Sequence, residues 1–116
     1  MPVRIKRIYE PISNHDGYRV LVDRLWPRGI KKENAQIDEW LKDVAPSQAL
    51  RQWFGHQPEK WASFYTRYSA ELYGSVPLEK LKTLMIKHET LTLLYAAKNE
   101  EYNHAIIIKE LLQSLQ

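Results

Sequence analysis

The stretch Thr90-Leu91-Thr92-Leu93-Leu94-Tyr95-Ala96-Ala97 is apolar almost without interruption. Such a run is typical of a central strand that is covered on both faces, because a half-buried strand alternates polar and apolar side chains. A helical pattern that begins at Pro77 precedes this run, and the apolar stripe of another helix, with Asn99 as its expected N-cap, follows it. Helix, strand and helix in this order predict a small α/β domain with a short, mostly parallel or mixed sheet flanked by helices.

The remaining elements are expected on the N-terminal side of this unit. Tyr18–Asp23 is predicted as a strand because β-branched and aromatic residues dominate it. A short strand around Val3–Ile8 precedes it, and the short loop between the two favours an antiparallel hairpin, since a parallel crossover normally takes a dozen residues. Residues 33–45 fit a helical face about as well as a short strand.

Two helices are expected after this segment. Ser47 is the expected N-cap of a short helix that Gly55 ends. A longer helix should follow, with the buried face Trp61, Phe64, Tyr65, Tyr68 and Leu72.

Length and composition limit the classes of protein to which the chain can belong. Its 116 residues, 44 % of them apolar, suit one domain with one core, so residues 1–116 are taken as a single domain. The chain has no apolar run long enough for a membrane helix, and charges stand where a signal peptide would have its apolar stretch. Cysteine is absent, which excludes disulfides, thiolate nucleophiles and Cys-ligated metals. We therefore expect a soluble cytoplasmic protein.

The sequence predicts no metal and no cofactor. The four histidines, at positions 15, 56, 88 and 104, do not have the spacing of a metal site. The phosphate-loop and dinucleotide-binding glycine patterns are absent as well, and four glycines in the whole chain could not supply them.

The net charge of +3 conceals an uneven distribution along the chain. Residues 1–32 hold eight basic and three acidic side chains. These cations could contact a nucleic-acid backbone, with an aromatic side chain stacked on the bases. Arg4, Lys6 and Arg7 could equally protect an exposed edge strand from pairing with another chain. Nucleic acid is therefore the weaker of the two partner predictions, behind a small anionic ligand.

The best candidate for a ligand site is the loop Asp23-Arg24-Leu25-Trp26-Pro27-Arg28-Gly29. Ligands of α/β proteins collect beyond the carboxyl ends of the strands, and this loop follows a predicted strand directly. Arg24 and Arg28 each present a planar fork of donors that matches phosphate or carboxylate oxygens, and Trp26 could stack on a planar group. Asp23 could act as an acid or base. The alternative is an Asp–Arg ion pair that rigidifies the loop, with Trp26 in the core.

The loop after the second predicted strand, residues 97–104, is the other candidate. His104 lies on the apolar stripe near the helix start, where a half-buried imidazole could serve as an acid or base, or could simply be a core residue with its hydrogen bonds satisfied. The free N–H groups of that first turn could receive an anion. Between the two loops, Arg51 could bind the same anion, Trp53 could form a wall, and His56 could face the ligand from a turn.

The amino-acid sequence resembles that of a known family. The string Asp16-Gly17-Tyr18-Arg19-Val20-Leu21-Val22-Asp23-Arg24-Leu25-Trp26-Pro27-Arg28-Gly29 looks like a signature of the YeaO-like branch of the domain of unknown function 488 (DUF488) family. The resemblance covers nearly the whole chain, through residues 40–47, 50–56, 67–72, 92–100 and 103–105.

The resemblance implies a small single-domain α/β protein and assigns no activity. Many members of the wider family carry Cys-His-Arg where this chain has Asn103-His104-Ala105. Only His104 matches that string. A mechanism that needs the Cys or the Arg could therefore not operate here unchanged.

These patterns together predict a protein that binds an anionic, phosphate- or nucleotide-like ligand in a strand-end cleft and could act on it. The candidate residues have two roles, namely ligand binding for Arg24, Trp26, Arg28, Arg51, Trp53 and His56, and acid/base chemistry for Asp23 and His104. The alternative is a non-catalytic module that binds nucleic acid or a protein. A third interpretation is that the Arg and Asp residues form buried structural pairs. The sequence leaves open whether the chain is an enzyme, and what its oligomeric state is.

Overall fold

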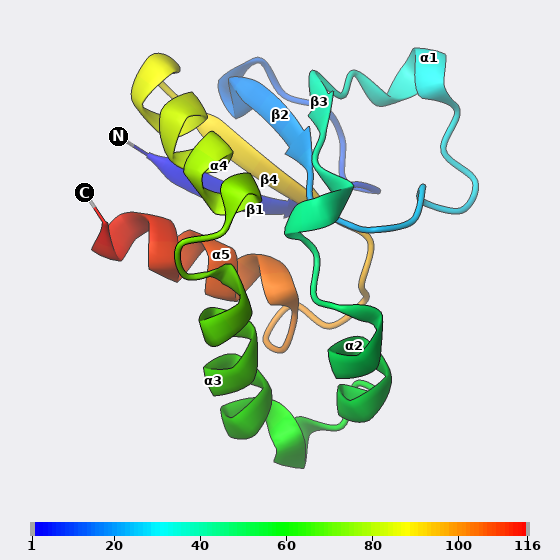
Figure 1. Ribbon diagram of the computed structural model, residues 1–116. Coiled ribbons are helices and arrows are strands. Elements are labelled where there is room, and N and C mark those ends of the chain that lie inside the picture. The colour runs from blue at the N-terminus through cyan, green and yellow to red at the C-terminus, as the bar shows by residue number, and fades with distance from the viewer. Residues whose placement is uncertain (1, 116) are drawn as a thin grey trace.

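The sheet has four strands and is parallel throughout. The computed structural model describes residues 2–115 of the chain. Its strands stand in the order β1-β4-β2-β3 (Figure 1). Their bounds are Val3–Arg7 for β1, Tyr18–Leu21 for β2, Glu39–Trp40 for β3 and Leu91–Tyr95 for β4. The apolar run that predicted a central strand is β4, and all five of its residues are buried. The small α/β fold predicted from the sequence is confirmed.

The predicted antiparallel hairpin between β1 and β2 is wrong. The β4 strand lies between them and pairs in parallel with both, with Val3 and Tyr18 both in register with Leu91. The connection from β1 to β2 crosses the sheet without a helix. It uses only residues 8–17, which include the 3-10 turn Asn14–Asp16. The loop-length argument fails because these ten residues are enough to return to the start of β4, where the Thr92 hydroxyl donates to the Asp16 carbonyl and the Tyr18 N–H donates to the Thr90 carbonyl.

Five α-helices complete the fold, and most of the predicted caps are confirmed. The helices are α1 (Lys32–Ala35), α2 (Gln48–Phe54), α3 (Trp61–Leu72), α4 (Val76–Lys87) and α5 (His104–Ser114), with 3-10 turns at Lys42–Val44 and Pro58–Lys60. The ambiguous residues 33–45 divide among α1, β3 and the first of these turns. Ser47 caps α2 by accepting the N–H of Leu50. Among the helices of residues 2–115, none is long and apolar enough to cross a membrane.

The prediction that Asn99 caps the last helix is wrong. Asn103 is the N-cap of α5, and its side chain accepts the N–H of Ile106. The Asn99 side chain instead accepts the N–H groups of Glu101 and Tyr102, which closes a turn within the loop. Both residues are Asn, and an Asn side chain can either cap a helix or close a turn, so the local sequence does not distinguish the two roles.

The main core lies on one face of the sheet. Val20, Val22, Leu91, Leu93 and Tyr95 point to this face and form one buried cluster with apolar residues of α2, α3, α4 and α5. Strand side chains alternate between faces, so the intervening residues point the other way. That second face has a smaller cluster, to which none of α2 to α5 contributes: Ile8, Leu21, Leu94 and partly buried residues of the loops, among them Trp26 and Trp40.

A buried ion cluster completes the second face. Asp16 is 3 % exposed, and its carboxylate pairs with Lys6 of β1 at 3.0 Å and with Arg19 of β2. The Thr92 hydroxyl of β4 donates to the Asp16 backbone carbonyl at 2.6 Å. Burial acts to raise the pKa of Asp16, but the N–H of Ser13 and the two cations outweigh it, so the pKa lies below its ordinary value. The cluster therefore joins three strands through one residue.

We predict that Asp16→Asn lowers the free energy of unfolding by about 3–5 kcal/mol, because it leaves two largely buried cations without their counter-charge. A lowered pKa means that the ionised carboxylate stabilises the fold above the ordinary pKa of 3.8 and loses that effect as the pH falls through the lower folded value. Urea unfolding between pH 2 and pH 7 measures the loss of unfolding free energy and its dependence on pH. Asp43→Asn is the control, since that carboxylate is 81 % exposed and 3.9 Å from its nearest cation. Equal stability of the two variants would contradict the prediction.

Candidate functional site

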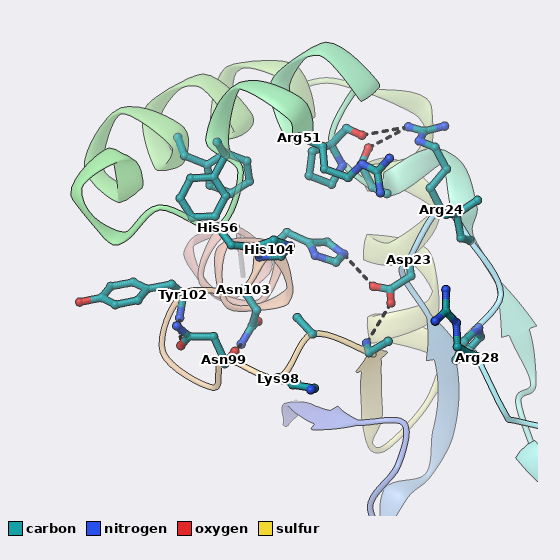
Figure 2. A pocket seen from close by; sticks show the side chains of 18 of the residues that line it. Asp23, Arg24, Arg28, Arg51, His56, Lys98, Asn99, Tyr102, Asn103 and His104 are labelled. Atoms are coloured by element: carbon teal, nitrogen blue, oxygen red, sulfur yellow. Dashed lines mark hydrogen bonds and ion pairs between the residues drawn. The ribbon is translucent and has the colours of Figure 1, made fainter.

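The parallel sheet brings the two candidate loops together. Because β2 and β4 are neighbours and run in the same direction, the loops that follow them leave the same edge of the sheet. Residues 23–28 and 96–99 line an open cleft of about 660 Å³, together with the start of α5 and residues of α2 and α3 (Figure 2). This volume lies in the usual range for small-molecule sites.

Seven of the eight predicted site residues line this cleft: Asp23, Arg24, Trp26, Arg28, Arg51, His56 and His104. Trp53 does not. Its ring instead contacts the cations of Lys60 and Arg67, at 5.0 Å and 4.3 Å from the ring centre. Lys98 and Tyr102 line the cleft and were not singled out, although the rule that selected their loop applied to them too. Tyr9, Phe54 and Phe64 also line it, and no local pattern in the sequence indicates this.

The Asp23 carboxylate and the His104 ring form the floor of the cleft. Oδ2 of Asp23 accepts the N–H of Ala96 at 2.9 Å, and Oδ1 lies 3.3 Å from Nε2 of His104. The same Nε2 is 3.0 Å from the carbonyl oxygen of Val22. Since a carbonyl and a carboxylate both accept, Nε2 carries a proton. Burial raises the pKa of Asp23, while the His104 ring and the Ala96 N–H act in the opposite direction.

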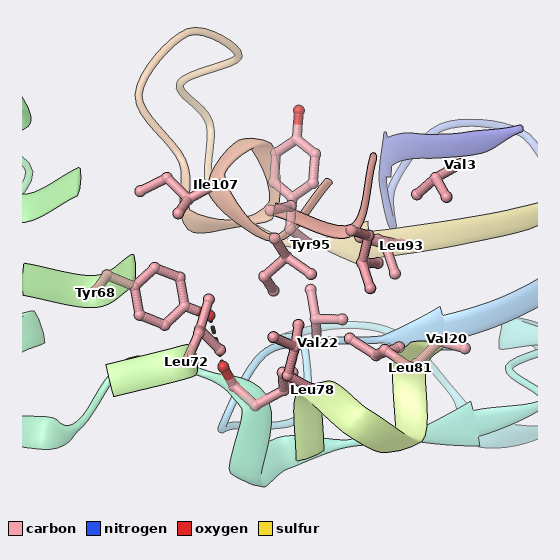
Figure 3. Close-up of a cluster of buried hydrophobic side chains, with 14 of the residues drawn as sticks. Val3, Val20, Val22, Tyr68, Leu72, Leu78, Leu81, Leu93, Tyr95 and Ile107 are labelled. Carbon is pink, nitrogen blue, oxygen red and sulfur yellow. Dashed lines mark hydrogen bonds between the residues drawn. The ribbon is translucent and has the colours of Figure 1, made fainter. Parts of the chain in front are cut away.

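The core holds the His104 ring in place. The Tyr68 ring meets it edge-on, with 6.1 Å between the ring centres. The Tyr68 side chain is fully buried, and its hydroxyl donates to the carbonyl of Val44 at 2.6 Å (Figure 3). Burial raises the pKa of Tyr68 well above its ordinary value, so this hydroxyl stays protonated and keeps its hydrogen bond. His104 thus has a defined orientation before any ligand binds.

Four Arg and Lys side chains line the cleft among the described residues, and they differ in how they are held. Arg24 donates to the carbonyls of Ala45 and Pro46, both at 3.2 Å, which anchors its guanidinium to the segment before α2. Its Nε is buried and has no hydrogen-bond partner within the described residues. Arg28, Arg51 and Lys98 are exposed, and within residues 2–115 their charged groups make no ion pair or hydrogen bond. Against these cations stands one carboxylate, that of Asp23, among the described lining residues.

The remaining walls are largely aromatic. Phe54 of α2 and Phe64 of α3 stack on one another, with their ring centres 4.3 Å apart. The rings of Tyr102 and Trp61 have their centres 5.4 Å apart. Trp26 meets Trp40 edge-on, also with 5.4 Å between the ring centres. The indole N–H of Trp26 donates to the carbonyl of Ile30, so this side chain is fixed by its loop. A ligand with a flat apolar portion would therefore meet rigid surfaces.

The cleft offers cationic donors and titratable side chains, but few nucleophiles. No Ser, Thr or Cys occurs among the described residues that line it. Its titratable groups are Asp23, His104, His56, Lys98 and two tyrosines. Within residues 2–115, no three His, Asp or Glu side chains lie close enough together to hold a metal ion.

Comparison with known proteins places the chain in a family. Residues 2–116 match the family model described as "Inactive DUF488-N3 subclade". The chain belongs to the DUF488 family. The uncharacterized protein YeaO of Escherichia coli (strain K12) is 45 % identical over 115 residues, which cover 99 % of this chain and 100 % of that protein. The uncharacterized protein Rv3073c of Mycobacterium tuberculosis (strain ATCC 25618 / H37Rv) is 44 % identical over 110 residues, or 95 % and 92 % of the two chains. No solved structure matches the chain.

The raised pKa of Asp23 gives a prediction for stability. An acid whose pKa is higher in the folded state destabilises that state as the pH rises from its ordinary value, here 3.8, through the folded value. Asp23→Asn removes this titration and can still accept the Ala96 N–H. At pH 7 the variant should therefore unfold with the same free energy as the parent or a higher one, and its advantage should shrink below pH 4. A loss above about 1.5 kcal/mol at pH 7 would instead identify Asp23 as a structural clamp.

Proposed function

We propose that this protein binds a small anionic ligand, phosphate- or nucleotide-like, in the cleft at the carboxyl ends of β2 and β4. The observation that carries the proposal is a group of cations, Arg28, Arg51 and Lys98, that have no partner within residues 2–115 and lie at a cleft with one carboxylate among its described lining residues. Exposed cations usually point into solvent, and three that share a concave site provide the charge and the donors that phosphate oxygens need. The aromatic walls favour a ligand with a flat body attached to its anionic group.

Binding without turnover is the better-supported form of the proposal. The matching family model carries the word "inactive" in its description. Asn103, which stands where many members of the wider family carry Cys, caps α5 and is only 3 % exposed. A group that transfers to a protein nucleophile would find no hydroxyl of Ser or Thr at the described walls. Asp23 and His104 then act in recognition, through their hydrogen-bonding capacity.

The distribution of the basic residues favours a pocket over a polyanion-binding surface. Lys6 and Arg19 pair with the buried Asp16, and Arg7 and Arg24 donate to backbone carbonyls. Half of the eight basic residues in 1–32 thus have partners inside the protein. Of the other four, Arg28 lies at the cleft, and Arg4, Lys31 and Lys32 lie outside its lining. This partial neutralisation of the basic segment favours a compact anion over a long nucleic-acid backbone.

We predict that Arg28→Ala and Arg51→Ala each weaken the binding of phenyl phosphate or adenosine 5′-monophosphate about tenfold or more. Each substitution removes a charge-assisted hydrogen bond, and a tenfold change corresponds to about 1.4 kcal/mol. Isothermal titration at constant ionic strength measures the affinity, and thermal unfolding should change little because both side chains are exposed. Enzyme-coupled release of inorganic phosphate from both ligands should stay at the background rate.

Arg4→Ala is the matched control. Arg4 is exposed on β1, outside the cleft, and its loss changes the net charge by the same amount. Affinity that falls equally in all three variants would indicate general attraction between a basic protein and an anion, and would overturn the proposal. Unchanged affinity in Arg28→Ala and Arg51→Ala would overturn it as well. Steep salt dependence with duplex DNA or RNA, and no binding of the small phosphates, would support the nucleic-acid alternative.

A further inference from the structure

We infer that the ligand of this cleft is bipolar, with an anionic group for the arginines and a hydrogen-bond donor, an amine or a hydroxyl, for the carboxylate of Asp23. The inference rests on the proposed function and specifies the chemistry of its ligand. It comes from Asp23, the one acidic side chain among the described residues that line the cleft.

Asp23 has an oxygen whose hydrogen bonding is incomplete. Its Oδ2 accepts a hydrogen bond from the Ala96 N–H at 2.9 Å. The nearest donor to Oδ1 is Nε2 of His104 at 3.3 Å, but that single N–H is directed at the Val22 carbonyl, 3.0 Å away. No other donor to Oδ1 comes from the described residues. A carboxylate has about four acceptor positions, so Asp23 can accept a further donor from the cleft.

The position of this oxygen makes the missing donor significant. The Asp23 side chain is 17 % exposed, and the part that remains exposed faces the cleft. Burial raises its pKa, which means that the ionised form is poorly solvated there. A ligand that fills the cleft would remove the remaining water from Oδ1. Unless the ligand brings a donor of its own, it leaves a carboxylate oxygen without a partner.

The arrangement of charges in the cleft separates the anionic group of the proposed ligand from its hydrogen-bond donor. Figure 2 shows Arg51 above the Asp23 carboxylate and Arg28 to its right, with the His104 ring beside it. An anion bound directly over the floor would meet the negative charge of Asp23, so the anionic group belongs at the arginines.

The experiment compares phosphates with and without an amine, so its first comparison needs only the wild-type protein. Ethyl phosphate is compared with O-phosphoethanolamine, and phenyl phosphate with 4-aminophenyl phosphate, which test a short and a longer spacing between phosphate and amine. We expect the amine to improve the affinity of the wild-type protein at least fivefold in one of the pairs, measured by isothermal titration at pH 7.5. The ammonium of O-phosphoethanolamine lowers the net negative charge, so general attraction to a basic protein would give the opposite order.

Two variants assign the effect to its residue. Asp23→Asn should reduce the gain from the amine to less than twofold, and should strengthen the binding of the plain phosphate, because the repulsion is gone. Arg51→Ala should weaken both members of a pair equally and preserve the gain. This contrast separates the donor end of the ligand from its anionic end.

Each other outcome has a definite meaning. Equal affinity within both pairs in the wild-type protein, with binding that still depends on Arg28 and Arg51, overturns the bipolar ligand and leaves the proposed function standing. A gain that survives Asp23→Asn shows that the donor is received elsewhere and also overturns the inference. Failure of every phosphate to bind overturns the proposed function, and this inference with it.

Discussion

The buried carboxylate of Asp16 is the interaction on which the arrangement of the strands depends. It holds Lys6 of β1 and Arg19 of β2, and its own carbonyl receives the Thr92 hydroxyl of β4. The Arg19 guanidinium also donates to the carbonyl of Ala35, in the segment between β2 and β3. Buried charges are strongly unfavourable without their partners, so a register that separated these residues would leave several of them unpaired. The cluster therefore favours one strand order, with β4 in the middle.

That strand order determines where the cleft lies. Asp16 stands just before β2, and Asp23 stands two residues after its last residue, so the two carboxylates mark opposite ends of one strand. Their surroundings differ accordingly. Two cations and a backbone N–H hold the pKa of Asp16 below its ordinary value, whereas burial raises the pKa of Asp23 with only His104 and one N–H to oppose it. The first carboxylate has its partners within the fold, and the second has a vacant acceptor position in the cleft.

The sequence predicted the elements and the two loops because these depend on local patterns. An uninterrupted apolar run located β4, helical apolar periodicity located α3, and Ser47 marked the start of α2. The pairing of β1 with β4 was missed, because it joins residues some ninety positions apart through an ion cluster that no local pattern indicates. The loop-length rule then selected the nearer strand as the partner of β1.

The misplacement of Trp53 could have been avoided from helix geometry alone. Residues two positions apart on an α-helix point in nearly opposite directions, whereas residues three apart share a face. If Arg51 faces the cleft, Trp53 therefore points away from it, and Phe54 points toward it, as the lining of the cleft confirms. Trp53 is close to Arg51 in the sequence, but the helix directs the two side chains to different faces. The contributions of Tyr9 and Phe64 are different, because only the tertiary fold brings these residues to the site.

The first strand connects the structural cluster to the cleft. Lys6 of β1 reaches Asp16, and the next residue, Arg7, points to the opposite face and donates to the carbonyls of Ala96 and Ala97. The backbone that Arg7 holds includes the Ala96 N–H that binds Asp23. Neighbouring cations on one edge strand thus fix the order of the sheet and the orientation of the cleft floor. Because Lys6 and Arg7 are already paired within the fold, the cations without partners among the described residues of the cleft are Arg28, Arg51 and Lys98.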